Sequence, residues 1–193
     1  MKNLFHEQTA LLTLETERLI VRTLTLKDEA ALHFYYSKNR TRLEPLEPER
    51  PHNFYTLPYW RERIKSAHEA FKKDVYYSFI INIKDSGQVV GCINFMNITR
   101  GSSFGCRVGY SLDGEAEGNG YMREALAEAI KYMFRVQNMH RIRAAYMPQN
   151  SRSAKLLTSL GFQEEGLAKD YLLIDGTWQD HVLTALINPF WKP

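Results

Sequence analysis

Residues 108–126, VGYSLDGEAEGNGYMREAL, decide the fold of this chain. They combine a strand-like apolar start, a turn with two glycines and the beginning of a long amphipathic helix. Gly118 and Gly120 leave backbone N–H groups bare at the N-terminus of that helix. Because such groups and the helix dipole attract anions, the stretch predicts a site for a phosphate-bearing ligand.

The whole chain has the size and composition of one globular domain. Its 193 residues are 44% hydrophobic and 24% charged, which is enough for a substantial core. We therefore expect a single domain over residues 1–193, with a structured core at about 12–187. The formal net charge of +3 is compatible with an anionic cofactor or a ribosomal partner, but it selects neither.

Cysteine and histidine usage argues against a metal site. Cys92 and Cys106 lie in apolar strand-like runs, so we expect reduced, buried thiols. The sequence has no CxxC or HExxH motif, and its six histidines are scattered. No apolar run is long enough to span a membrane, and the first ten residues lack a secretory signal, so a soluble cytoplasmic protein is expected.

The predicted elements indicate an α+β fold with a mixed sheet. Strands are predicted at 18–24, 75–83, 89–98, 104–112 and 141–147, with a final hairpin of 171–174 and 178–187. Helices are predicted at about 28–36, 57–72, 121–136 and 150–160.

The connections between these elements predict the pairing of the strands. Short turns join the three strands between residues 75 and 112, which should form an antiparallel meander. A helix separates 104–112 from 141–147, so these two strands should be parallel neighbours. Residues 43–51 contain three prolines and are predicted to be a stiff, exposed loop without regular structure.

The glycine turn differs from two common phosphate-binding loops. No Lys-Ser/Thr pair follows the glycines, as a Walker A loop requires. Arg123 stands where the dinucleotide-binding fingerprint has its third glycine. Taken alone, the turn could simply connect a strand to a helix without any ligand.

A second motif makes the turn more specific. EGNGYM at 117–122 follows one strand, and N-x-x-S-x-x-x-L-x-x-L-G-F at 150–162 follows the next. Together they resemble the paired motifs of the GNAT N-acetyltransferases, and the resemblance covers nearly the whole chain. It implies a GNAT fold, with a mixed, mostly antiparallel sheet, a splayed parallel strand pair and about four helices. Within the superfamily the chain is most similar to the ribosomal-protein-alanine N-acetyltransferases of the RimJ type, on residues 97–102, 146–150 and 169–186.

The resemblance implies acetyl-CoA as the donor. The implied contact residues are Tyr110, Ser111, Leu112, Gly118, Asn119, Gly120, Tyr121, Met122, Arg123, Asn150 and Ser153. Glu117 and Met122 depart from the family pattern Gln/Arg-x-x-Gly-x-Gly/Ala, and Glu117 would place an anion beside a diphosphate. We therefore assign phosphate binding to the backbone N–H groups of residues 118–123, with Arg123 as an added charge. A free N–H near Tyr110 or Leu112 could polarise the thioester carbonyl.

The catalytic side chains of related enzymes do not carry over. Those enzymes place a glutamate on the second splayed strand and a tyrosine on the following helix, where this chain has Ala145 and Leu157. Ser153 is our candidate for protonating or hydrogen-bonding the thiolate, although it could also be a helix cap. The candidates for binding the acceptor ammonium or relaying its proton are Glu44, Glu47 and Asp170, although each could be an ordinary surface charge.

The missing base favours an α-amine as acceptor. An α-amino group has a pKa of about 7.7–8.0, so roughly one in seven is neutral at pH 7, whereas a lysine at about 10.4 is almost never neutral. The resemblance implies the N-terminal alanine of the fifth protein of the small ribosomal subunit, and association with that subunit is possible.

Two other functions stay open. A GNAT enzyme for a small amine would be favoured by an acidic, enclosed pocket, whereas an open groove would favour a peptide. A non-catalytic role in ribosome assembly or RNA binding would need a basic surface, and Arg141 and Arg143 make only a small patch.

Overall fold

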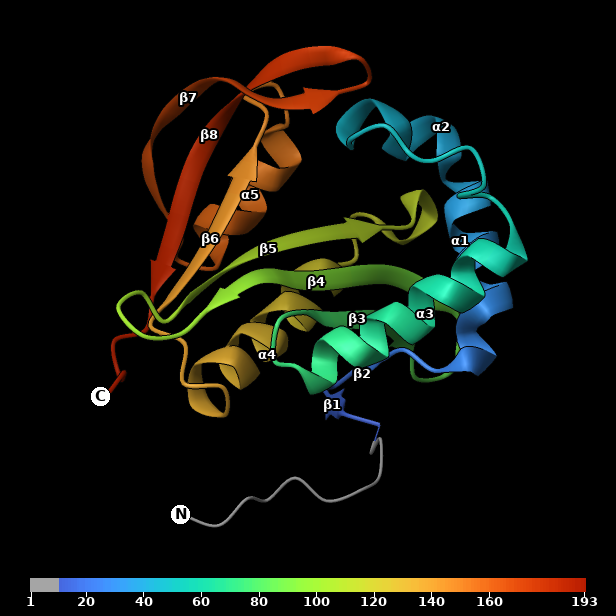
Figure 1. Cartoon of the computed structure of the whole chain (residues 1–193), viewed down its shortest axis with the longest axis horizontal. Helices are drawn as coiled ribbons and strands as arrows, with labels where there is room; N and C mark the ends of the chain where they lie inside the picture. The colour runs from blue at the N-terminus through green and yellow to red at the C-terminus, as the bar shows by residue number, and fades with distance from the viewer. Residues whose placement is uncertain (1–10) are drawn as a thin grey trace.

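One sheet of eight strands, in the order β1-β2-β3-β4-β5-β6-β8-β7, organises the chain (Figure 1). The computed structural model describes residues 11–193. The strands are β1 (Thr13–Glu15), β2 (Leu19–Thr23), β3 (Tyr77–Ile83), β4 (Val89–Thr99), β5 (Gly105–Leu112), β6 (Arg141–Tyr146), β7 (Gln163–Ile174) and β8 (Thr177–Ile187). All neighbours pair antiparallel except β5 and β6, which are parallel. The predicted meander and the predicted parallel pair are both confirmed.

Five α-helices accompany the sheet. They are α1 (Glu29–Lys38), α2 (Arg40–Leu43), α3 (Leu57–Lys72), α4 (Tyr121–Arg135) and α5 (Ser151–Ser159). Four of them were predicted, and α2 is a single additional turn. Short 3-10 turns occupy Leu26–Asp28, Glu44–Leu46 and Gly114–Ala116. Within residues 11–193, no helix has both the length and the apolar character needed to cross a membrane.

Two predictions about local structure were wrong. Residues 43–51 are not wholly irregular, because α2 ends at Leu43 and a 3-10 turn spans Glu44–Leu46. Pro45 is tolerated there, since the first residues of a helical turn have no intrahelical use for their N–H groups. The final hairpin is also longer than predicted: β7 begins at Gln163, and a bulged stretch between Ala168 and Leu172 interrupts its pairing with β8. Such a bulge hides the strand's alternating pattern.

The sheet is buried on both faces over its central strands. Phe79 and Ile81 of β3 belong to a cluster that includes Leu126 of α4 and Leu157 of α5. Ile80, between them, belongs to a second cluster. The residues of that second cluster on α1 and α3 are Leu32, Tyr35, Tyr36, Trp60, Ile64 and Ala67. The sheet therefore separates an α4–α5 side from an α1–α3 side.

The parallel strands β5 and β6 separate along their length. They pair only at Gly105–Arg141, Cys106–Ile142 and Arg107–Arg143. Beyond this point β5 continues to Leu112 alongside β4, and β6 continues to Tyr146 alongside β8. Figure 1 shows the two strands diverging toward the end of the sheet that carries the glycine turn. The splayed pair implied by the family resemblance is therefore present.

Candidate active site

Beyond their last register pair, β5 and β6 are separated by a gap, and the edge of β5 that faces this gap carries free backbone N–H groups. The N–H of Asp113 donates to the carbonyl oxygen of Val90 in β4, at 2.7 Å. Because successive residues of a strand direct their backbone groups to opposite sides, the N–H groups of Tyr110 and Leu112 face the gap. The carbonyl oxygen of Leu112 is on that side too, where the guanidinium of Arg42 donates to it. An extended ligand can therefore bond this edge as an additional strand would.

The glycine turn continues directly from this edge. Gly118 has a φ of 80° and Gly120 a φ of 76°, a left-handed backbone that favours glycine. Within residues 11–193, no acceptor is found for the N–H groups of residues 118–123. Nothing lies within 4 Å of a Cβ built on Gly118, whereas one built on Gly120 would lie 3.6 Å from the guanidinium of Arg18. These N–H groups at the start of α4 suit a phosphate.

Glu117 does not leave an uncompensated charge beside the turn. Its carboxylate pairs with Arg42 of α2 at 2.8 Å and with Arg152 of α5 at 2.5 Å. These two arginines offset the negative charge of Glu117, which the sequence alone suggested would disfavour diphosphate binding. Met122 is only 7% exposed and lies in the core, so its backbone alone is available to a ligand. Arg123 is exposed next to the turn.

Three of the predicted residues come together across the gap. The hydroxyl groups of Tyr110 on β5 and Ser153 on α5 lie 2.6 Å apart and share a hydrogen bond. The side chain of Asn150 caps α5 by accepting from the backbone N–H of Ser153, at 3.1 Å. Burial raises the pKa of Tyr110 to about 12, although the Ser153 hydroxyl opposes this. The phenol thus stays protonated at neutral pH and can orient the serine hydroxyl.

Ser111 faces the other side of the sheet. Its hydroxyl accepts a hydrogen bond from Tyr35 of α1, at 2.9 Å. Its backbone faces β4, because it alternates with Tyr110 and Leu112. Ser111 therefore belongs to the α1–α3 side rather than to the gap. Tyr35 and Arg42 were not predicted, because neither lies in a recognisable sequence motif.

Asp113 fastens α1 to the end of β5. It is 2% exposed and accepts hydrogen bonds from the side chains of Asn39, at 3.0 Å, and Lys38, at 3.2 Å. Burial alone would raise the pKa of Asp113, but the hydrogen bonds from Asn39, from the N–H of Glu115 and from Lys38 lower it overall. The wall formed by α1 is therefore held in place by a buried carboxylate.

The three carboxylates proposed for the acceptor do not contact Ser153, and the first of them, Glu44, pairs with Arg40 at 2.9 Å. Glu47 pairs with Arg50, whose side chain is 7% exposed and whose guanidinium stacks over Phe54. Asp170 is exposed in the bulge of β7, and its backbone N–H donates to Asp180 at 3.0 Å. No contact joins any of the three carboxylates to the Tyr110–Ser153 pair, so their roles stay predictions.

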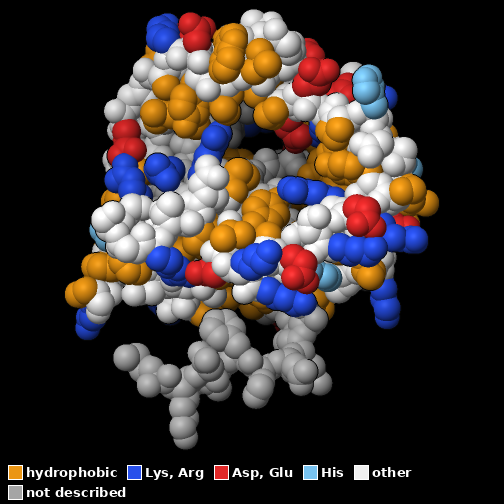
Figure 2. Space-filling model, viewed as in Figure 1, with side chains coloured by type: hydrophobic (Ala, Val, Ile, Leu, Met, Phe, Trp, Pro, Cys, Tyr) orange, Lys and Arg blue, Asp and Glu red, His pale blue; other side chains and the backbone are white. Residues whose placement is uncertain are grey.

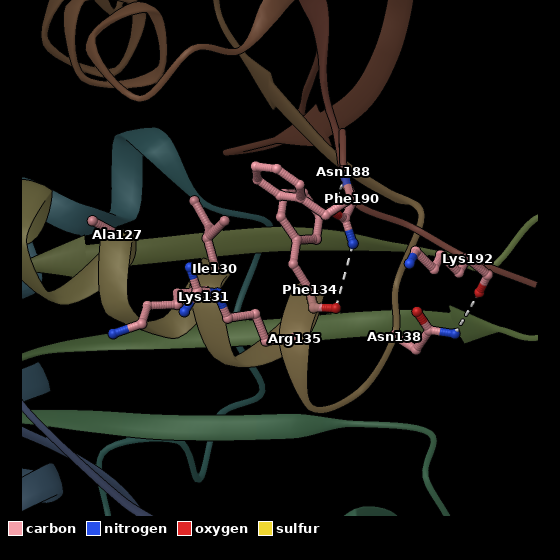
Figure 3. Close-up of a pocket in the computed structure, with 9 residues that line it drawn as sticks. All are labelled: Ala127, Ile130, Lys131, Phe134, Arg135, Asn138, Asn188, Phe190 and Lys192. Atoms are coloured by element: carbon pink, nitrogen blue, oxygen red, sulfur yellow. Dashed lines mark hydrogen bonds between the residues drawn. The ribbon is translucent and has the colours of Figure 1, made fainter.

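An open hollow lies next to the gap. Figure 2 shows it between the β7–β8 hairpin and the α1–α2 segment, with apolar side chains beside it. A separate hollow of about 670 Å³ lies on the outer face of α4, under the C-terminal segment (Figure 3). Its lining includes Phe134, Asn188 and Phe190 and contains no pair of titratable groups suited to acyl transfer.

Neither cysteine suits a covalent mechanism. Cys92 and Cys106 are free and buried, and burial raises the pKa of each thiol to about 12. A protonated, buried thiol is a poor nucleophile. Within residues 11–193, no group of three or more His, Cys, Asp or Glu side chains could hold a metal ion.

Comparison with known proteins assigns the family. Residues 18–163 match the model of the acetyltransferase (GNAT) domain. The chain is 46% identical over 180 residues to the [ribosomal protein uS5]-alanine N-acetyltransferase of Escherichia coli K12. The aligned region covers 93% of each of the two chains.

Two solved structures are similar. The ribosomal-protein-S5-alanine acetyltransferase of Vibrio fischeri has a TM-score of 0.91 and 42% identity, covering 94% of this chain and 100% of that one. RimJ of Mycobacterium smegmatis in complex with CoA-disulfide has a TM-score of 0.83 and 29% identity, covering 88% and 81%. With its splayed strands, glycine turn and Tyr110–Ser153 pair, the chain belongs to the GNAT acetyltransferase family and is an N-acetyltransferase.

Proposed function

We propose that the protein is an acetyl-CoA-dependent Nα-acetyltransferase that acts on the N-terminal alanine of ribosomal protein uS5, the fifth protein of the small subunit. The observation that carries this proposal is the open edge of β5, which runs into the glycine turn. The unpaired backbone groups of β5, which can bond amides, are thus followed directly by the backbone N–H groups of the turn, which can bind phosphate. The 46% identity to the enzyme of Escherichia coli supports the acceptor. Such a reaction belongs in the cytoplasm, where ribosomal proteins are made.

Acetyl-CoA supplies an acetyl thioester when it is bound. We assign its phosphates to the backbone N–H groups of residues 118–123, with Arg123 nearby as an added charge. The backbone N–H groups of Tyr110 and Leu112 are free to donate to a carbonyl oxygen in the gap, whereas the carbonyl oxygen of Leu112 already accepts from Arg42. Ser111, which faces α1, is instead assigned to the acceptor side.

The proton balance of acyl transfer requires one proton to leave the amine and one to reach the departing thiolate. We assign Ser153 to hydrogen-bonding or protonating the thiolate, supported by the hydrogen bond through which Tyr110 orients its hydroxyl. Glu47 and Asp170 remain our candidates for holding the acceptor ammonium or relaying its proton. Since Glu47 is already shared with Arg50, a binding role suits it better than proton uptake.

The acceptor side favours a peptide over a small polyamine. The hollow is open to solvent rather than enclosed (Figure 2). The strand face that leads away from it carries Arg107 and Arg143, which would repel a polycation. A role in RNA binding has less support, because Arg141 is already paired with Glu165.

One assay tests this function. The protein is mixed with acetyl-CoA and a peptide that begins with the uS5 alanine, and free thiol and acetylated peptide are measured. An N-terminally blocked, lysine-containing peptide and spermidine serve as alternative acceptors. We expect product only with the free N-terminus. Faster acetylation of spermidine, or of the blocked peptide, would contradict the proposal.

A further inference from the structure

Two arginines lie side by side where the parallel strands separate. Arg107 of β5 and Arg143 of β6 form the last register pair before the gap. The preceding pair, Cys106 and Ile142, is buried in the cluster on the α4–α5 side. Because side chains alternate along a strand, both arginines project from the opposite face, which is the acceptor side.

This pair lacks a compensating charge within the described part of the chain. Arg141, two residues earlier on the same face of β6, pairs with Glu165, and Arg42 pairs with Glu117. Within residues 11–193 no carboxylate lies within ion-pair distance of Arg107 or Arg143. Like charges on directly opposite positions of neighbouring strands repel each other. An anion bound between them would offset this repulsion.

Arg107 is held in a defined orientation. Its guanidinium lies over the ring of Tyr171 from β7, 5.7 Å from the ring centre. Tyr171 in turn packs against the buried His181, with ring centres 5.6 Å apart. A guanidinium fixed on an aromatic face still presents its N–H groups at its edge, which is the geometry that binds a carboxylate.

The position of the arginine pair argues against its binding a phosphate group of acetyl-CoA. From Arg107, β5 continues for five residues, about 17 Å, to Leu112, and the glycine turn at residues 118–120 lies beyond that end. By contrast, Tyr110 lies only three residues, or about 10 Å, from Arg107. An extended peptide whose first residue reacts next to Tyr110 would bring its third to fifth residues to the arginines.

We propose that Arg107 and Arg143 bind the carboxylate of an acidic residue at the third to fifth position of the acceptor peptide. This inference rests on the proposed function and names its substrate class more closely: N-termini followed at short distance by Glu or Asp. The pair acts in binding the acceptor and takes no part in the chemistry at the thioester.

Steady-state kinetics with matched peptides test the proposal. Two peptides begin with alanine and differ only by Glu or Gln at the fourth residue, and further pairs move the Glu to the third or fifth. In the wild-type protein we expect the best Glu peptide to have a KM about tenfold lower than its Gln partner, with kcat unchanged. In Arg107→Gln and Arg143→Gln this difference should disappear, while the KM for the Gln peptide and for acetyl-CoA stays the same.

Arg141→Gln is the matched control, because Arg141 lies on the same strand face but is paired with Glu165. It should keep the preference for the Glu peptide. Equal KM values for all Glu and Gln peptides in the wild type would overturn the proposal, as would an equal loss for both peptides in the arginine variants.

Direct binding measurements distinguish failure of the arginine site from failure of the proposed function. If neither peptide is acetylated, the proposed function fails, and fluorescence anisotropy of labelled Glu and Gln peptides then tests the arginine pair alone. Tighter binding of the Glu peptide that Arg107→Gln removes would support the pair as a carboxylate site. Equal binding of both peptides would refute it.

Discussion

Ser153 makes one contact through its backbone and another through its side-chain hydroxyl. Its backbone N–H is capped by Asn150, and its hydroxyl shares a hydrogen bond with Tyr110. The cap fixes the start of α5, so the hydroxyl is aimed at the gap by the helix itself. A serine that only capped the helix would use its own side chain for the backbone, which Ser153 does not.

We expect Ser153→Ala to lower kcat by roughly 10- to 100-fold, since it removes a hydrogen bond to a group that becomes charged. Acetyl-CoA affinity should change much less, because the Asn150 cap and the N–H groups of the turn remain. Turnover is measured by thiol release, and affinity by calorimetry.

Ser159→Ala is the control, since Ser159 lies on the same helix and bonds only to the carbonyl of Leu156. It should leave kcat unchanged. Unaltered turnover in Ser153→Ala would reduce the serine to a packing residue of α5.

At the scale of elements, the glycine turn and the strand pattern were both predictable from sequence. Alternation and short turns define β3, β4 and β5, and a helical crossover requires β6 to be parallel to β5. Where the strands stop pairing was not predictable, because register depends on contacts between segments distant in sequence. For the same reason, the ion pairs of Glu117 with Arg42 and with Arg152 could not be predicted.

The turn gives a matched pair of glycine substitutions. Gly118 and Gly176 both have positive φ, at 80° and 71°, and nothing lies within 4 Å of a Cβ at either site. Alanine at each should cost about 1–2 kcal/mol in unfolding free energy, because L-residues disfavour this backbone.

Only Gly118→Ala should also raise the Kd for acetyl-CoA, by about tenfold, because it shifts the N–H groups of the turn. Gly176 lies in the β7–β8 turn and should leave that Kd unchanged. Denaturant unfolding and calorimetry measure the two effects. Equal Kd values in both variants would contradict phosphate binding by the turn.

Across the whole molecule, the sheet separates the residues that we assign to the donor from those that we assign to the acceptor. Ser153 and the start of α4 lie on one side, and Tyr35, Ser111 and the arginine pair on the other. Each side has its own hydrophobic cluster, so damage to one cluster should affect one substrate first.

Ile64→Ala in α3 and Leu126→Ala in α4 test this division, because both side chains are fully buried. Each should lower the unfolding free energy by about 2–5 kcal/mol. Below the unfolding transition, Ile64→Ala should raise KM for the peptide more than KM for acetyl-CoA, and Leu126→Ala should do the reverse. Equal effects of both variants on both substrates would show that the two sides are not separable.

The short pairing of β5 with β6 also has a mechanical consequence. α5 contacts β6, whereas α4 contacts β1, β2 and β4, so each arm of the sheet carries a helix of its own. The arms meet at the three register pairs of residues 105–107 with 141–143. A rotation about this junction would change the width of the gap, which the Tyr110–Ser153 hydrogen bond and the Glu117–Arg152 ion pair also span. For a strand of five residues, about 17 Å long, a rotation of about 5° at the junction moves the far end by about 1.5 Å. Small changes at the junction therefore alter the width of the gap.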